Sequence, residues 1–186
     1  MSVPSESEMD RAMRKWKMLF EFLDLDGDGF LKLEEFMEFP TQLIKVGKVD
    51  LGSHLAKVYK SHWDKVCQAV NLPPGQQKIG GDLWIKGFHV VNQSKWFQSN
   101  FVPTMSKAFF DSMDKNGNNL ISLEEWREHY NLMGANDEEF IRQSFAKMDE
   151  NGDGEISREE FDHAFWSFSN YHGPDKDFSF LYNKFK

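Results

Sequence analysis

Residues 24–35 read DLDGDGFLKLEE, and two later stretches follow the same pattern: DKNGNNLISLEE at 114–125 and DENGDGEISREE at 149–160. Each stretch has Asp or Asn at its first, third and fifth positions and Glu at its twelfth. Each follows a Phe-x-x-(Leu or Met) segment and ends in Glu-Glu before an aromatic residue. Self-similarity of this kind indicates one supersecondary unit repeated along the chain.

The residues around these loops predict that each unit is a helix, a loop and a second helix. Before the first loop, Met13, Trp16, Phe20 and Leu23 recur at intervals of three and four residues, which places them on one face of a helix. The glutamates that close each loop suit the N-terminus of a following helix, where the helix dipole stabilises acidic groups. The fold is therefore expected to be all-α.

A fourth unit is predicted between the first and second of these stretches. Loops of this kind pair through a short two-stranded ladder, so the unit around residues 24–35 needs a partner, and residues 57–92 can supply it. Ile79 would take the ladder position that Leu31 holds in the first loop. The loop of this fourth unit has no carboxylate at its first, third, fifth or twelfth position. The residues there are Leu72, Pro74, Gln76 and Leu83. We expect it to be a structural partner only.

The predicted architecture has four helix-loop-helix units in two pairs, packed into one compact globule. The first pair, with its degenerate second loop, is assigned to residues 1–97, and the second pair to residues 98–186, with Asn92–Asn100 as the connection. The second assignment includes an aromatic C-terminal tail, Tyr171–Lys186, which is expected to fold back over the core because free tails rarely carry so many aromatic residues.

The polar residues of the three intact loops are the oxygen donors that calcium prefers. Calcium takes six to eight oxygens at about 2.3–2.6 Å, and a twelve-residue loop supplies them at positions 1, 3, 5, 7, 9 and 12. Position 6 needs a positive φ, which Gly29 and Gly154 adopt freely and Asn119 adopts next most readily. The candidate ligands are Asp24, Asp26, Asp28, the Phe30 carbonyl and Glu35; Asp114, Asn116, Asn118, the Leu120 carbonyl, Ser122 and Glu125; and Asp149, Asn151, Asp153, the Glu155 carbonyl, Ser157 and Glu160.

The three loops differ in charge. Lys32 stands at position 9 of the first loop and cannot be a ligand, so a water is expected in that place. Loop 24–35 has four carboxylates at its ligand positions, loop 149–160 has three and loop 114–125 has two. Because fewer carboxylates attract calcium less strongly, loop 114–125 is predicted to be the weakest site. Glu at position 12 in all three loops favours calcium over magnesium, which is expected only to compete.

Composition excludes several functional classes. The net charge of −8 disfavours nucleic acid as a partner. The sequence contains no run of 18 apolar residues, so no membrane span is expected. The polar start of the chain lacks the apolar stretch of a signal peptide, and the single cysteine, Cys67, cannot form an internal disulfide, so a cytoplasmic location is expected. The six histidines form no metal-binding spacing, and no catalytic motif occurs, so no enzymatic activity is expected.

With three intact loops, a degenerate second loop, Asn119 at position 6 of the third and an aromatic tail, the chain resembles the invertebrate sarcoplasmic calcium-binding proteins, an EF-hand family. Calexcitins, coelenterazine-binding proteins and calcium-activated photoproteins share this layout. The resemblance implies four EF-hands, the second degenerate, and a monomeric cytosolic calcium buffer that holds three calcium ions.

Two other roles stay open at this stage. A calexcitin-like calcium sensor would expose a groove for a target peptide, and a coelenterazine-binding or photoprotein relative would hold an apolar small ligand. Jellyfish photoproteins carry histidines where this chain has Trp16 and Phe165, which weakens the light-emitting alternative, although comb-jelly photoproteins lack those histidines too.

Overall fold

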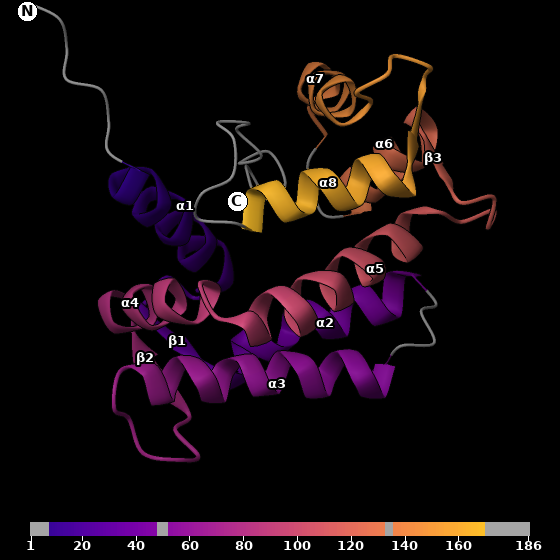
Figure 1. The fold of residues 1–186 in the computed structure, drawn as a ribbon. Helices are drawn as coiled ribbons and strands as arrows, with labels where there is room; N and C mark the ends of the chain where they lie inside the picture. The colour runs from indigo at the N-terminus through magenta and orange to yellow at the C-terminus, as the bar shows by residue number, and fades with distance from the viewer. Residues whose placement is uncertain (1–7, 48–51, 133–135, 170–186) are drawn as a thin grey trace, which may run out of the picture.

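The computed structural model describes residues 8–47, 52–132 and 136–169, so the predicted tail lies outside the described residues. Within those ranges the chain is mostly helical (Figure 1), and each twelve-residue loop contains a three-residue strand that leads directly into a helix. The elements of the first two units are α1 (Glu8–Leu23), β1 (Phe30–Lys32), α2 (Leu33–Gly47), α3 (Gly52–Ala69), β2 (Lys78–Gly80) and α4 (Gly81–Asn92). Those that follow are η1 (Phe97–Phe101), α5 (Val102–Met113), β3 (Leu120–Ser122), α6 (Leu123–Leu132), α7 (Glu138–Met148), β4 (Glu155–Ser157) and α8 (Arg158–Ser169).

Two antiparallel ladders join the four units into two pairs. Strand β1 pairs with β2 so that Leu31 lies opposite Ile79, and β3 pairs with β4 so that Ile121 lies opposite Ile156. All four of these side chains are buried. The predictions of four helix-loop-helix units, of their pairing and of Ile79 as the ladder residue of the degenerate unit are therefore confirmed.

The degenerate loop keeps its shape through protein contacts. The indole N–H of Trp63, a fully buried side chain of α3, donates a 2.8 Å hydrogen bond to the carbonyl of Gln76. The amide of Leu33 donates to the carbonyl of Gln77 at 2.9 Å, which extends the ladder beyond the paired strands. These contacts hold the loop against the first unit without a metal ligand at its first, third, fifth or twelfth position.

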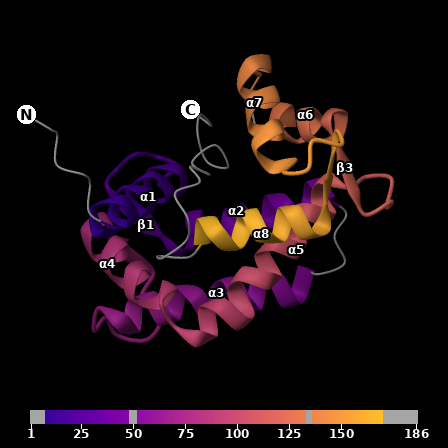
Figure 2. The same cartoon turned by 45° about the horizontal axis from the view of Figure 1, so that its top comes forward.

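The two halves share one aromatic core. In two views related by a 45° turn, α5 of the second half lies beside α2 of the first half and beside α8 (Figures 1 and 2). Phe109 of α5 connects them, with its ring centroid 5.4 Å from that of Phe39 and 5.6 Å from that of Phe165. The predicted compact globule is therefore confirmed.

The connection between the halves is itself partly helical. Residues 97–101 form a π-helical turn, η1, that continues into α5. Its Phe97 and Phe101 are buried and stack on each other at 4.8 Å, so the segment belongs to the core. The predicted division at residues 97 and 98 falls inside this turn, and the two-domain assignment stays a prediction. No described helix is both long and apolar enough to cross a bilayer.

Close packing of α3 on α4 depends on Gly87. A Cβ at this position would lie 2.7 Å from the carbonyl oxygen of Val66, which is backbone and cannot move aside easily. Gly87→Ala should therefore lower the free energy of unfolding by about 1–3 kcal/mol, although alanine favours a helix over glycine. Urea unfolding of the calcium-loaded protein measures the change. The control is Lys86→Ala at the exposed neighbouring position, and equal effects of the two substitutions would contradict the packing argument.

Candidate metal centre

The turn in each intact loop needs left-handed backbone at position 6, and the structure has it. The φ angles are +79° at Gly29, +62° at Asn119 and +89° at Gly154. The degenerate loop has its own left-handed residue, Gly75, at φ +79°. Prediction of a positive φ at the non-glycine residue Asn119 is therefore confirmed, and the three loops turn alike.

Backbone N–H groups converge on the first aspartate of each loop. In the first loop, Oδ1 of Asp24 accepts from the amide of Gly27 and Oδ2 from that of Gly29, both at 3.0 Å. Asp114 and Asp149 accept the equivalent two hydrogen bonds at 2.8 and 3.0 Å. This network offsets the negative charge and holds the loop in the shape that a cation requires.

The carboxylates of the first loop lie at the spacing of a calcium shell. Ligand oxygens of Asp24, Asp26 and Asp28 all lie within 4.8 Å of one another. Oxygens on opposite sides of a calcium ion at its usual bond length are about 4.6–5.2 Å apart. The three side chains therefore fit around one calcium ion.

The closing glutamates lie over their loops. Oε2 of Glu125 accepts from the amide and the hydroxyl of Ser122 at 2.9 and 2.8 Å, and Oε1 accepts from the amide of Lys115 at 3.1 Å. Burial raises the pKa of Glu125, but the hydrogen bonds from Ser122 and the loop amides outweigh it and hold the pKa below its ordinary value. Glu160 has the same arrangement with Ser157, and its pKa is lowered in the same way. The lowered pKa favours the ionised form of both carboxylates, which is the form that binds a cation.

The first loop differs at position 9. The amino group of Lys32 lies 3.3 Å from Oδ2 of Asp28 and 3.8 Å from Oε2 of Glu35, and it also pairs with Asp26. The sequence identified Lys32 only as a residue that is not a ligand. In the structure its ammonium group contacts three of the four carboxylates of the loop.

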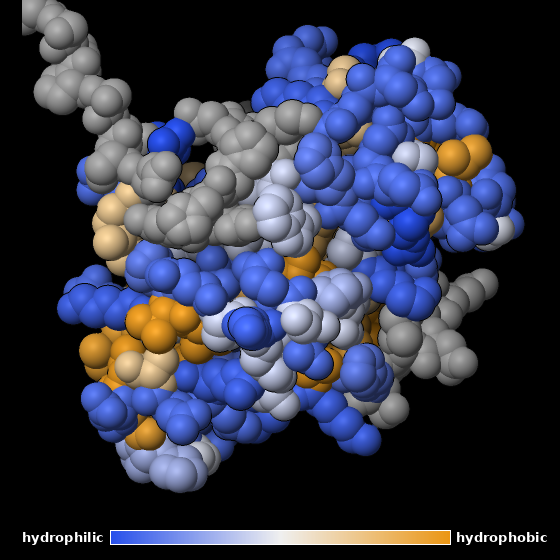
Figure 3. Space-filling view, in the orientation of Figure 1, coloured by the Kyte–Doolittle hydropathy of each residue, from blue (hydrophilic) through white to orange (hydrophobic). Residues whose placement is uncertain are grey.

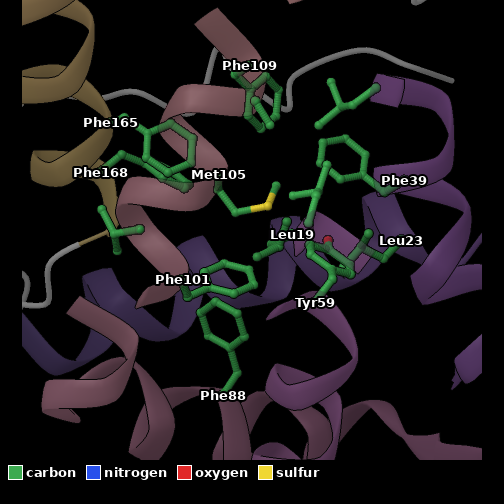
Figure 4. Close-up of a cluster of buried hydrophobic side chains, with 14 of the residues drawn as sticks. Leu19, Leu23, Phe39, Tyr59, Phe88, Phe101, Met105, Phe109, Phe165 and Phe168 are labelled. Carbon is green, nitrogen blue, oxygen red and sulfur yellow. The ribbon is translucent and has the colours of Figure 1, made fainter. Parts of the chain in front are cut away.

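A second candidate site lies at the centre of the core. A cavity of about 30 Å³ is enclosed by side chains of both halves (Figure 4), and Trp16 and Phe165, which the sequence comparison singled out, both line it. This volume is room for about one water molecule. The aromatic and sulfur-containing side chains labelled in Figure 4 come from α2, α3, α4, η1, α5 and α8, and α1 contributes Leu19 and Leu23.

His62 is the polar residue of this cavity that sequence reasoning missed. It is fully buried, its ring lies 4.3 Å from that of Phe101 and 5.0 Å from that of Phe88, and neither of its nitrogens has a hydrogen-bond partner. Oδ1 of Asn92, which also lines the cavity, has none either. Burial lowers the pKa of His62 to about 3, so the ring is neutral at pH 7. Its spacing of four residues from both Val58 and Val66 places His62 on the buried face of α3, and this is the sequence signal that could have found it.

Comparisons with known proteins agree with this geometry. Residues 104–165 match the EF-hand domain pair family and residues 17–40 match the EF hand family. Each half of the chain therefore contains a segment that matches an EF-hand model, the helix-loop-helix unit that binds calcium through such a loop.

The chain is also similar to individual known proteins. It is 24% identical to the luciferin-binding protein of Renilla reniformis over 85% of this chain and 86% of that protein. Its fold is similar to calcium-loaded apo coelenterazine-binding protein from Renilla muelleri, with 23% identity, a TM-score of 0.55 and coverage of 90% of this chain and 92% of that one. Photoprotein clytin shares the fold at a TM-score of 0.70 and 20% identity, with 96% of both chains covered. These comparisons do not support the sarcoplasmic family in particular.

The low pKa of His62 makes stability depend on pH. The unfolded chain binds a proton at this residue below about pH 6.5 and the folded chain does not, so the free energy of unfolding falls as pH falls from about 6.5 towards 3. Between pH 8 and pH 5 the free energy of unfolding of the wild type should fall, and His62 should account for up to about 2 kcal/mol of that fall. In His62→Phe the fall should be smaller by this amount.

Chemical unfolding at saturating calcium, repeated at several pH values, measures this slope. His54→Phe, at an exposed position of the same helix, is the control. A wild-type slope that survives in His62→Phe would show that the buried imidazole does not carry the effect.

Proposed function

We propose that the protein binds three calcium ions per chain, in loops 24–35, 114–125 and 149–160, and that magnesium competes for them. The observation that carries the proposal is the hydrogen-bond network on the first aspartate, which is the same in all three loops and involves Asp24, Asp114 and Asp149. The second loop is expected to bind none, because it has no carboxylate at any ligand position.

Calorimetric titration with calcium, with and without magnesium, tests the stoichiometry. The wild type should bind three ions, and each of Glu35→Gln, Glu125→Gln and Glu160→Gln should bind two at micromolar calcium, because each loses the ligand that closes its shell. The matched controls are Glu34→Gln, Glu124→Gln and Glu159→Gln, which remove the same charge from the exposed neighbouring residue and should still bind three. Saturation of the wild type at two ions would contradict the proposal.

For the role of this binding we propose calcium-linked carriage of an apolar aromatic small molecule of the coelenterazine class, without catalysis. Support comes from the aromatic lining shared by both halves, from the unpartnered polar atoms of His62 and Asn92, and from the similarity to luciferin-binding protein. The cavity now has room for about one water, so a ligand would have to displace side chains. Helices α1, α2, α5 and α8, which line the cavity, also flank the calcium loops, so the two binding events would be coupled.

A cytosolic calcium buffer is the second candidate, and the nearly filled cavity is the observation that favours it. We propose a cytoplasmic location and a monomer for either role. Cys67 is buried and burial is the main reason that its pKa is raised, so it is a structural residue.

A calcium sensor would instead need a target peptide as its partner. The face shown in Figure 3 has an apolar patch where α4 lies, and Leu83 and Val90 of α4 are exposed.

Titration with coelenterazine, followed by tryptophan fluorescence, separates the two candidates. Carriage predicts one ligand per chain and an affinity that changes at least several-fold between calcium and chelator. Met105→Trp should abolish uptake by filling the cavity while still binding three calcium ions, and Lys107→Trp, at an exposed position of the same helix, should leave uptake unchanged. No uptake by the wild type in either calcium state would leave the buffer role.

A further inference from the structure

Two lysines contact the calcium ligands of the first loop, and one of them comes from the degenerate unit. The amino group of Lys78, in β2, donates a 3.1 Å hydrogen bond to Oδ2 of Asp28, the same oxygen that lies 3.3 Å from the amino group of Lys32. Lys78 also lies over the ring of Phe30, 4.2 Å from its centroid. The ammonium group of Lys78 is therefore held from two sides.

These lysines contact the oxygens of Asp26 and Asp28 that make no hydrogen bond to a loop amide. Oδ1 of Asp26 accepts from the amide of Asp28, and Oδ1 of Asp28 accepts from the amide of Phe30. This leaves the Oδ2 atoms as the oxygens not already bonded to loop amides, and both Oδ2 atoms face lysine. A calcium ion bound by Asp26 and Asp28 would compete with the two ammonium groups for the charge of the same two carboxylates.

The ladder increases this competition. Lys32 and Lys78 lie directly opposite each other on β1 and β2, and like charges in that position repel. While the aspartates pair with both lysines, this repulsion is offset. A calcium ion bound to the aspartates would weaken these ion pairs, and the repulsion between the two ammonium groups across the ladder would then be less offset.

The second pair of units has no such arrangement. The corresponding cross-strand pair is Ser122 opposite Glu155, and the hydroxyls of Ser122 and Ser157 donate to the closing glutamates. Among the ion pairs of the described residues, those with a calcium-ligand side chain all belong to the first loop. The four carboxylates of the first loop are thus partly neutralised by two cations, whereas the three of loop 149–160 are not.

We propose that Lys32 and Lys78 act as tethered competitors that lower the calcium affinity of the first loop, so that loop 149–160 fills before it. The metal-free second unit thereby regulates the site of its partner, beyond completing the ladder. This inference rests on the proposed three-site binding. It also revises the ranking by carboxylate number alone, in which the first loop has the most charge.

The test is a calcium titration of the full-length protein followed by nuclear magnetic resonance. The amides of Gly29, Asn119 and Gly154 each donate to the first aspartate of their own loop, so each reports occupancy of one site. In the wild type, the Gly154 signal should respond at lower calcium than the Gly29 signal.

Lys32→Met and Lys78→Met should each lower the calcium midpoint of the Gly29 signal by about threefold, the size expected for one partly exposed ion pair. Methionine removes the charge and offers calcium no oxygen ligand. The double variant should lower the midpoint further, while the midpoints of Asn119 and Gly154 stay unchanged.

Two controls separate this effect from others. Lys32→Arg keeps the charge and should leave the Gly29 midpoint near the wild-type value. Lys60→Met removes the same charge from α3, where Lys60 pairs with Asp64, which is not a ligand, and should also have no effect.

An unchanged Gly29 midpoint in both methionine variants, or an equal shift in Lys60→Met, would overturn the inference while leaving three-site binding intact. A Gly29 signal that does not respond to calcium in any variant would instead overturn the three-site proposal.

Discussion

Crowding of carboxylates into a twelve-residue loop is the constraint on which the rest of the structure depends. Like charges at these separations repel, and the loops offset the repulsion by directing backbone N–H groups at the first aspartate, such as Gly27 and Gly29 at Asp24. That network requires left-handed backbone at position 6, which is why glycine or asparagine stands there. The shape of each loop follows from its electrostatics.

A single loop of this kind exposes an unpaired strand, so the loops occur in pairs. The degenerate second unit keeps this pairing even though no metal is expected in its loop. Ile79 opposite Leu31 completes the ladder, and the indole of Trp63 holds the loop through the carbonyl of Gln76. A unit without its own ligands can then change the charge at its neighbour, as Lys78 does beside Asp28.

The helices that enter and leave the loops also build the shared core. Because α1, α2, α5 and α8 both flank loops and line the central cavity, a change at a loop can reach the cavity through rigid helices. His62 and Asn92 place unpartnered polar atoms in that otherwise aromatic interior. Such atoms reduce stability unless a polar group contacts them, which is the physical basis for considering a ligand at this place.

The sequence by itself determined the loops, their candidate ligands, the helices around them and the pairing of Leu31 with Ile79. The loops and their flanking helices depend on contacts within about twelve residues, and the pairing of the units follows from a pattern that repeats along the chain. Only the tertiary structure decided that η1 joins the core, that His62 is buried without partners, and that Lys78 lies beside Asp28, 50 residues away in the chain. Those contacts come from the packing of distant segments, so counting carboxylates within one loop could not include a cation that another loop supplies.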